Sequence, residues 1–568
     1  MRKPGALVAV LVLLAIGALW FRLPALDNRP MHGDEAVHAY KFHDLWKQGV
    51  YRYDPNEYHG PTIYYAELPV VWLKGIKTFK DVQGADYRLP IVLFGAGMLL
   101  LLIPLHDALG KHGTLISALL LGISPAFVFY SRDYIQEILL AFFTLGMLAC
   151  GWRYARSLKD AWLIGAGVSA GLMIATKETA VVTFLACLLG AGMTALWSRR
   201  IDGKTPPGDS LDAGTYAESP TGASQGGLSD EEPIPGWSWN PRVLGLAVGI
   251  ALLTACLVLT NFFHHPAAMI DYMRAYTPWL GRAHRTTVHN HPWNYYLHML
   301  IWWKTGRNAP WSEGLIVGLA VIGMVAALLP KARGRLEGNV GFCRFVTFST
   351  LILTAGYSVI SYKTPWCILS FLLGMILMAG FGAVALLRWA PGFPLKPLVI
   401  LGLLIALGQL GWQSYRTSYV AYVDEANPYV YAQPVPDVLE LAKQMQKLSL
   451  AYHEHDNMVV KIVSKDEYYW PIPWYLRQFP NQGFYVGSVP DDIQVQAPIV
   501  LADPDYDEIL TKKLGDTHLM NHIYGLRPGT FFEIWIRMDV WTSYLEWKKT
   551  QPQPKEDPAT GEPLPSGS

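Results

Sequence analysis

Residues 30–40 of the chain read Pro-Met-His-Gly-Asp-Glu-Ala-Val-His-Ala-Tyr, and they follow the first apolar run, at 5–21, after a short connection. Two adjacent carboxylates, Asp34 and Glu35, therefore lie between two histidines where a membrane helix would end at the water. Ionisable side chains are costly near the apolar part of a bilayer, and those that occur there are commonly functional. If the chain is an enzyme, we expect its catalytic base in this stretch.

The composition indicates a membrane protein. Of the 568 residues, 51% are hydrophobic and only 16% are charged, a balance typical of chains with many membrane helices. The net charge of +1 gives no argument for a nucleic-acid partner. The five cysteines form no CxxC pair and no zinc-like spacing, so neither a disulfide framework nor a structural metal is indicated.

About eleven stretches are long enough to span a bilayer, which takes roughly 17–25 residues each. They lie at 5–21, 89–106, 113–130, 134–151, 161–176, 178–197, 243–263, 312–330, 344–362, 365–387 and 397–413. No small-x-small cleavage site follows the first stretch, which we interpret as a signal anchor. The predicted fold class is therefore mainly α, a polytopic membrane protein.

The short loops predict the orientation, because cytoplasmic loops carry an excess of Lys and Arg. With the N-terminus inside, the short inner loops hold ten of these cations and the short outer loops hold three, Arg132, Lys177 and Lys363. The N-terminus is then cytoplasmic. The acidic pair, the 264–311 loop and the C-terminal part are then all predicted to lie on the outer, extracytoplasmic side of the membrane.

We expect a transmembrane domain at 1–416 with three large loops. The first outer loop, 24–88, has helix-like apolar spacing at 35–48 and a short apolar run near 62–73, which favours helices lying at the interface. The inner loop 200–241 is rich in Gly, Ser, Pro and acid and is predicted to be disordered. The second outer loop, 264–311, is basic and aromatic, as expected of a clamp over a lipid phosphate or a saccharide.

The C-terminal part has a different pattern. Between 417 and 548, helix-like segments alternate with short Val/Ile/Tyr-rich runs, which favours a small α/β domain. Helices are expected at 437–453, 470–478 and 506–514 and strands at 458–464, 483–489, 497–502 and 530–536, followed by a last helix. No glycine-rich phosphate loop follows any of these strands, and the tail 549–568 is predicted to be disordered.

The acidic pair allows three interpretations. Neighbouring positions on a helix point about 100° apart, so one carboxylate can face a cleft while the other orients a partner. Acidic residues also favour the first turn of any helix, with no catalytic role. His32, Asp34 and His38 could instead hold a divalent cation, since Asp34 and His38 lie one turn apart.

Charged residues also occur in the tight outer turns. Glu137 follows Arg132, Glu178 follows Lys177, and Lys363 lies in a third turn. Each cation could simply extend to the interface. Because all three turns share the predicted outer face with Asp34, they could together bind a phosphate beside a base.

The chain resembles the GT-C superfamily of membrane glycosyltransferases, in particular the dolichyl-phosphate-mannose protein mannosyltransferase and aminoarabinose-transferase type. The likeness to a prokaryotic subfamily of Agl23-like, flippase-activity-associated proteins is closer. It rests on His32-x-Asp34-Glu35-Ala-Val-His38, Tyr51-Arg-Tyr-Asp54-Pro-x-x-Tyr-His59-Gly-Pro61, Tyr130-Ser-Arg132, Glu137, Tyr362-Lys-Thr-Pro-Trp366 and Tyr469-Trp-Pro-x-Pro-Trp-Tyr-Leu-Arg477. Over about 1–480, the resemblance implies a GT-C-like fold with an extracytoplasmic C-terminal α/β domain.

The resemblance also implies an activity. Enzymes of this type move a sugar from a polyprenyl phosphate to an acceptor outside the membrane, usually with inversion, so the chain is expected to be a glycosyltransferase of the hexosyl-transferring class. Asp34 matches their catalytic base and Glu35 its neighbour. Candidates for substrate binding are His38, His59, Tyr64, Arg132, Glu137, Lys177, Glu178, Arg282 and Lys363.

The expected partners are a polyprenyl-phosphate-linked sugar, a glycan, lipid or protein acceptor, and membrane lipids, but no nucleic acid. A divalent cation at His32, Asp34 and His38 is the one cofactor that the pattern suggests. The alternative function is a transporter or an accessory subunit for lipid-linked sugar flipping. Transporters usually carry ionisable residues near the bilayer midplane and repeated halves, whereas the spans predicted here have nearly charge-free centres.

Overall fold

A computed structural model describes residues 5–56, 59–202, 240–278, 281, 289–329, 336–494 and 497–551. Most of the two segments predicted to be disordered, 200–241 and 549–568, lies outside the described residues. The chain divides into two compact units. The helical unit comprises Met1–Asp27, Lys41–Lys77 and Val82–Tyr431, and the sheet unit comprises Asn28–Tyr40, Thr78–Asp81 and Ala432–Ser568. The predicted boundaries at 416 and 548 remain predictions.

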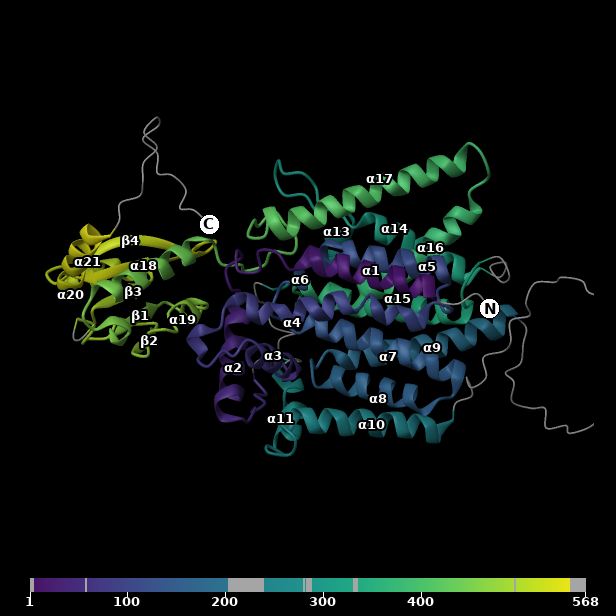
Figure 1. Ribbon diagram of the computed structural model, residues 1–568, viewed down its shortest axis with the longest axis horizontal. Helices are drawn as coiled ribbons and strands as arrows, with labels where there is room; N and C mark the ends of the chain where they lie inside the picture. The colour runs from purple at the N-terminus through teal and green to yellow at the C-terminus, as the bar shows by residue number, and fades with distance from the viewer. Residues whose placement is uncertain are drawn as a thin grey trace, which may run out of the picture. The chain divides into compact units, whose positions relative to one another are not determined.

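Most of the helical unit consists of apolar helices (Figure 1). Its α-helices are α1 (Gly5–Arg22), α3 (Thr62–Leu73), α4 (Gly84–Gly97), α5 (Lys111–Ile123), α6 (Pro125–Tyr130), α7 (Glu137–Ser157), α8 (Asp160–Ile174), α9 (Ala180–Asp202), α10 (Pro241–Leu259), α11 (Ala268–Arg274), α13 (Tyr295–Ile301), α14 (Gly314–Leu328), α15 (Val340–Val359), α16 (Leu369–Trp389) and α17 (Leu395–Tyr415). Short helical turns extend three of them, at η2 (Leu100–Leu105), η4 (Pro365–Ile368) and η5 (Arg416–Val420). Helix α2 (Gly33–Gln48) begins in the sheet unit and ends in the helical unit.

Within the described ranges, eight helices are long and apolar enough to cross a membrane. They are Gly5–Arg22, Gly84–Leu105, Glu137–Ser157, Ala180–Arg200, Pro241–Leu259, Val340–Val359, Pro365–Trp389 and Leu395–Val420. The predicted spans at 113–130, 161–176 and 312–330 correspond instead to shorter apolar helices, of 13 to 15 residues. The multi-pass membrane fold is therefore confirmed, and the count of eleven spans is not.

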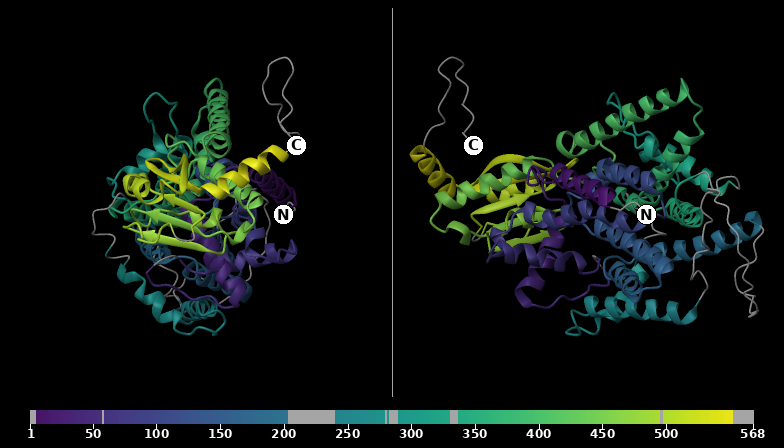
Figure 2. Two further views of the ribbon diagram at one scale, coloured as in Figure 1. Left: turned by 90° about the vertical axis from the view of Figure 1, so that its left-hand side faces the viewer. Right: turned by 45° about the vertical axis from the view of Figure 1, so that its right-hand side comes forward.

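Small residues allow the buried helices of this unit to approach closely. A Cβ atom added to Gly323 of α14 would lie 2.1 Å from the carbonyl oxygen of Met378, and one added to Gly382 of α16 would lie 2.0 Å from that of Leu319. The two backbones are therefore in direct contact, as is common between membrane helices. Helix α8 also packs between α7 and α10 (Figure 1), and Figure 2 shows the helices of this unit from two further sides.

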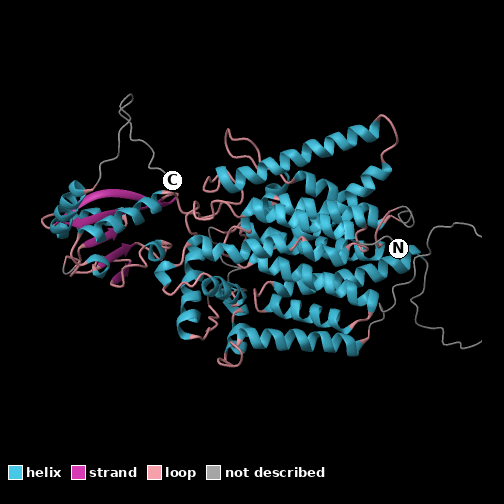
Figure 3. Cartoon of the chain, viewed as in Figure 1, coloured by secondary structure: helices cyan, strands magenta, loops and turns pink. Residues whose placement is uncertain are grey.

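All five named strands of the described chain lie in the sheet unit (Figure 3). They are β1 (Val460–Ser464), β2 (Gln482–Val486), β3 (Ile499–Ala502), β4 (His518–Arg527) and β5 (Thr530–Arg537), in the spatial order β2-β1-β3-β5-β4. Strand β1 pairs in parallel with β2 and β3, whereas β5 runs antiparallel to β3 and β4. Strand β4 was not predicted, because its polar and glycine positions give no clear alternation.

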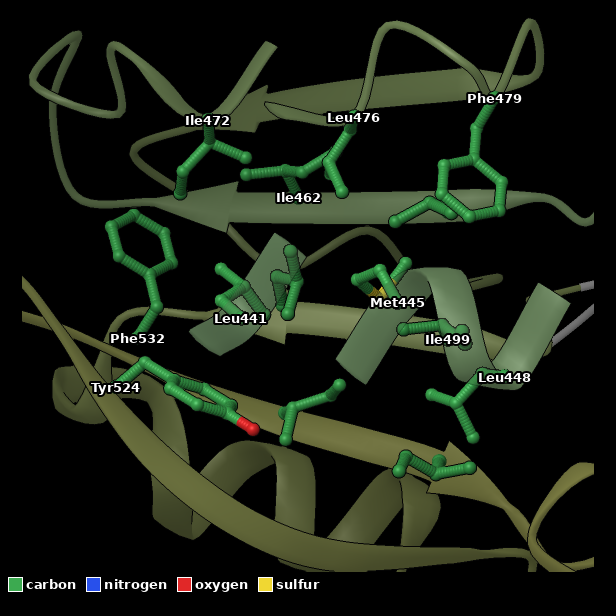
Figure 4. Close-up of a cluster of buried hydrophobic side chains, with 14 of the residues drawn as sticks. Leu441, Met445, Leu448, Ile462, Ile472, Leu476, Phe479, Ile499, Tyr524 and Phe532 are labelled. Atoms are coloured by element: carbon green, nitrogen blue, oxygen red, sulfur yellow. The ribbon is translucent and has the colours of Figure 1, made fainter. Parts of the chain in front are cut away.

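Helices cover both faces of this mixed sheet. They are α18 (Asp437–Ala451), α19 (Ile472–Tyr475), α20 (Asp507–Leu514) and α21 (Met538–Thr550), with the short turns η1 (Phe79–Asp81), η6 (His455–Asn457) and η7 (Pro504–Tyr506). The larger core joins Leu441 and Met445 of α18 to Ile462 and Ile499 of the sheet and to Phe479 (Figure 4). The α/β nature of this part is therefore as predicted, although α19 is only one turn long instead of the expected 470–478.

Candidate functional site

Part of the acidic stretch forms the N-terminal cap of α2. The backbone N–H of His32 donates to a Glu35 carboxylate oxygen at 2.8 Å, and the backbone N–H of Asp34 donates to His32 Nδ1 at 3.1 Å. The carbonyl oxygen of His32 accepts the first helical hydrogen bond, from Ala36. This reciprocal arrangement satisfies amides that a helix start otherwise leaves unpaired. Glu35 is fully buried, so its carboxylate acts as a helix cap in this structure.

Asp34 differs from its neighbour in exposure and in contacts. Its side chain is 46% exposed, and its carboxylate lies 3.8 Å from His32 Nδ1, too far for a hydrogen bond. Asp34 is therefore the carboxylate of the pair that can meet a substrate. Within the described ranges, no three His, Cys, Asp or Glu side chains are grouped so that they could hold a metal ion. The suggested site of His32, Asp34 and His38 is thus not assembled.

In the helical unit, His59 and Glu178 form a buried pair. His59 Nδ1 lies 2.6 Å from Glu178 Oε2, and the Tyr53 hydroxyl donates to the other carboxylate oxygen. Burial opposes ionisation of Glu178, but the charge of His59 and these hydrogen bonds outweigh it and hold the pKa of Glu178 below its ordinary value. The backbone of Gly60 donates to the Thr176 carbonyl at 3.1 Å and fixes the loop that carries His59.

The preceding residue, Lys177, forms a second ion pair with Glu137. Both side chains are buried. Burial lowers the pKa of Lys177, but the adjacent Glu137 carboxylate outweighs this effect, so the pKa is raised. The two charged residues of this turn, Lys177 and Glu178, are therefore each paired with a residue from another segment, and Lys177 does not extend to solvent as a snorkelling side chain would.

Arg132 contacts backbone carbonyls at the end of α1. Its guanidinium donates to the carbonyl oxygens of Arg22, Pro24 and Ala25, and also to the Tyr419 hydroxyl at 2.9 Å. It lies 4.4 Å from the centroid of the Tyr419 ring. A cation at a helix C-terminus is favourable because it satisfies unpaired carbonyls and opposes the helix dipole. Arg132 thus has a structural function whatever else it binds.

Lys363 is a buried cation without a carboxylate partner among the described residues. Its Nζ donates to the carbonyl oxygens of Ile360 and, at 3.2 Å, of His291. The segment around Lys363 also pairs with the segment around His289, because the backbone N–H of Lys363 donates to the His289 carbonyl oxygen at 2.9 Å. Burial lowers the pKa of Lys363. An uncompensated buried charge favours an anionic ligand, so Lys363 is better placed than Arg132 or Lys177 to attract an anion.

The remaining predicted site residues differ in their burial and in whether the structure describes them. His38 and Tyr64 are buried, and Arg282 lies outside the described residues. Sequence reasoning missed Tyr53, which completes the Glu178 site, and Glu67, which is fully buried and whose two carboxylate oxygens find no hydrogen-bond partner among the described residues. The motif quoted from 51–61 contained Tyr53 but no signal for its partner, whereas a glutamate inside the apolar run of α3 was a recognisable signal.

Comparison with known proteins agrees with this architecture. Residues 72–206 match the family model described as dolichyl-phosphate-mannose-protein mannosyltransferase. No curated protein matches the chain in sequence. The chain is similar to the crystal structure of ArnT from Cupriavidus metallidurans bound to undecaprenyl phosphate, with a TM-score of 0.59 and 13% identity over 92% of this chain and 97% of that one. The apo structure of the same ArnT gives a TM-score of 0.58 at 13% identity, with the same coverage.

The multi-pass helical unit and the small sheet domain thus have the fold seen in ArnT. This confirms the fold class expected from the sequence. The likeness extends over nearly the whole of both chains.

Proposed function

We propose that this protein is a membrane glycosyltransferase that moves a sugar from a polyprenyl phosphate to an acceptor outside the cytoplasm. The GT-C fold supports the proposal, as does the match of 72–206 to a mannosyltransferase family model. The similar ArnT structure contains undecaprenyl phosphate, which supports a donor of this lipid class. The Agl23-like subfamily and the domain division at 416 and 548 are parts of the same proposal.

Asp34 is the proposed catalytic base. The observation that carries this assignment is the difference in exposure between the two adjacent carboxylates. Glu35 is buried and caps α2, while the Asp34 carboxylate is partly exposed. A general base must be able to reach the hydroxyl whose proton it removes. Asp34 would deprotonate the acceptor hydroxyl, whose oxygen then attacks the anomeric carbon as the bond to the phosphate oxygen breaks. One such displacement inverts the anomeric centre.

The leaving group is a polyprenyl phosphate, which carries negative charge. Lys363 is the proposed cation for this phosphate, because it is buried and no carboxylate of the described chain neutralises it. Arg132 is proposed to add to the positive field around it, whereas Lys177 is the weaker candidate because Glu137 offsets its charge. A fixed cation close to a departing phosphate stabilises charge that develops in the transition state.

The proposed orientation places the N-terminus in the cytoplasm and the C-terminal domain outside. The excess of Lys and Arg in the loops assigned to the cytoplasm supports it. The acceptor and the donor headgroup would then meet on the outer side of the membrane.

The test is turnover of polyprenyl-phosphate-linked sugars by the purified full-length protein, with mannose, glucose and aminoarabinose as donor sugars. Asp34→Asn should reduce turnover by a factor on the order of 100 to 10,000, as expected for loss of a general base. Asp44→Asn is the matched control, because Asp44 is an exposed aspartate of the same helix, and it should retain wild-type turnover.

Full turnover by Asp34→Asn would refute the base assignment. Transport of the lipid-linked sugar across a liposome membrane, without release of sugar, would instead favour the flippase alternative.

A further inference from the structure

The sheet unit contains a row of aromatic rings that begins at the edge of its sheet. Phe484 of the edge strand β2 stacks on Tyr469, with ring centroids 5.0 Å apart and planes 28° apart. Tyr469 in turn lies 6.2 Å from Trp470 at 25°. The ring of Trp470 meets Tyr40 of α2 edge-on at 5.6 Å. We call Phe484, Tyr469, Trp470 and Tyr40 the aromatic row.

The aromatic row reaches the turn that carries Asp34. A Cβ atom built on Gly33, the residue before Asp34, would lie 3.7 Å from the Cβ atom of Trp470. The Tyr40 hydroxyl donates to the carbonyl oxygen of Pro473 at 2.8 Å. These contacts fix the start of α2 against residues 470–473 of the same unit, so the aromatic row and the proposed base belong to one surface.

Arg527 and Tyr468 complete this surface. The Arg527 guanidinium donates to the Tyr468 carbonyl oxygen and lies 5.4 Å from the centroid of the Tyr468 ring. Burial lowers the pKa of Arg527, and the charges of Asp466 and Asp34 counteract this effect. The rings of Tyr468 and Phe484 are 58% and 37% exposed. This part of the sheet unit therefore combines exposed aromatic side chains, a hydrogen-bond donor and the partly exposed Asp34 carboxylate.

We propose that this surface binds the acceptor as a saccharide, with its sugar rings packed on the aromatic row and on Tyr468 while Arg527 donates hydrogen bonds to its hydroxyl groups. The proposal rests on the proposed glycosyltransferase function and names the class of its acceptor as a glycan. Aromatic side chains combine a large apolar face with polar neighbours, which suits the alternating C–H faces and hydroxyl groups of a sugar ring. Asp34 would meet the hydroxyl that is glycosylated.

The local charges argue against a lipid headgroup. The charges are of both signs, with Asp34 and Asp466 negative and Arg527 and, near Tyr40, Arg477 positive, whereas anionic lipids are recognised by clusters of cations alone. A peptide could add to the edge strand β2 through its backbone, but such binding would not depend on the face of Tyr468 or on Arg527. Substitutions of Tyr468 and Arg527 therefore distinguish binding of a saccharide from binding of a peptide.

Saturation-transfer NMR on the full-length protein in nanodiscs tests the proposal. The probes are methyl α-mannoside, methyl α-glucoside and N-acetylglucosamine, with an octapeptide containing Ser and Thr as the peptide probe. We expect saturation of at least one sugar. Its affinity should fall about fivefold or more in Tyr468→Ala and in Arg527→Gln, which is the order expected for loss of one stacking or charge-assisted contact.

The controls are Phe531→Ala, which removes an exposed ring of β5, and Lys443→Gln, which removes an exposed cation of α18. Both should leave sugar binding unchanged, and Tyr468→Phe should retain it. No sugar binding, or sugar binding unaffected in both Tyr468→Ala and Arg527→Gln, overturns the proposal, as does binding of the peptide alone. Donor turnover by the wild-type protein is measured in parallel. Absence of donor turnover would contradict the proposed glycosyltransferase function. The NMR result would support or contradict only the proposed saccharide-binding surface.

Discussion

His59 Nδ1 lies 2.6 Å from a carboxylate oxygen of Glu178, which follows it by 119 positions in the chain. The pair joins the loop before α3 to the turn before α9, and Tyr53 hydrogen-bonds the same carboxylate. Buried ion pairs contribute little by comparison with apolar packing, but removal of one partner leaves an uncompensated polar group. The pair therefore fixes the position of the loop that precedes α3 in the helical unit.

Glu178→Gln should destabilise the protein by about 3 kcal/mol, because it removes one partner of a buried pair. The pKa of Glu178 is lowered in the folded state, so its stabilising effect is present above the ordinary carboxyl pKa and is lost as the pH falls through the lowered value. The difference in thermal unfolding temperature between variant and wild type should therefore be large at pH 7 and should shrink in acid.

Glu440→Gln is the control for this prediction, because Glu440 pairs with Lys443 on the surface of α18. Exposed pairs contribute about 0–1 kcal/mol, so this variant should unfold close to the wild-type temperature. Equal effects of the two variants would show that the Glu178 pair does not hold the loop.

Gly60→Ala tests the same loop by a steric route. A Cβ atom at Gly60 would lie 2.0 Å from the carbonyl oxygen of Ala175, so the loop must shift and carry His59 away from Glu178. We expect a loss of about 1–3 kcal/mol, as for other overpacked positions. The double variant Gly60→Ala/Glu178→Gln should lose less than the sum of the two single losses, because both break one contact.

Gly17 of α1 is the matched glycine, with no atom within 4 Å of its built Cβ. Gly17→Ala should be neutral or stabilising by up to about 1 kcal/mol, since alanine has the higher helix propensity. Strict additivity in the double variant would contradict the proposed link between Gly60 and the ion pair.

The sequence predicted the membrane helices well because a span must be long and apolar whatever its neighbours are. It was less informative about Lys111–Ile123, Asp160–Ile174 and Gly314–Leu328, where apolar residues continue past the ends of short helices. It could not reveal that residues 28–40 and 78–81 group with the C-terminal residues. That grouping depends on contacts between distant segments, which no local pattern encodes.

For the candidate site, too, the sequence could not show which residues from distant segments contact one another. The residue types around Asp34, Lys177 and Lys363 marked charged positions near the membrane, but not their partners. The structure pairs Lys177 with Glu137 and leaves Lys363 among carbonyl oxygens. Spacing along the chain cannot distinguish such a neutralised cation from an uncompensated one, because the partners come from other helices.

Substitutions of Glu35 separate helix capping from catalysis. Glu35→Gln keeps an oxygen that can accept the His32 N–H, so it should retain most stability and turnover. Glu35→Ala removes this acceptor and should cost about 1 kcal/mol, the usual effect of losing a helix cap. Thermal unfolding and donor turnover measure the two effects. If Glu35→Gln abolished turnover as completely as Asp34→Asn, Glu35 would be part of the chemistry rather than a cap.

Glu67 provides a prediction about alkaline pH. It is fully buried in α3, and neither carboxylate oxygen has a hydrogen-bond partner in the described part of the chain. Burial together with the charge of Asp86 raises its pKa to about 9. The folded state therefore holds this proton more tightly than the unfolded state, in which the pKa is close to the ordinary 4.5. The stabilising effect of the bound proton is complete below the unfolded value and is lost as the pH rises through the folded value.

Glu67→Gln replaces the neutral acid by a group of similar shape that does not ionise. The unfolding temperature of the wild type should therefore fall more steeply between pH 6 and pH 9.5 than that of Glu67→Gln, and the variant should be the more stable of the two at the alkaline end. Glu440→Gln, at an exposed carboxylate, should follow the wild-type curve. Parallel curves for wild type and Glu67→Gln would show that Glu67 is already ionised in the folded protein, which requires a partner for its charge.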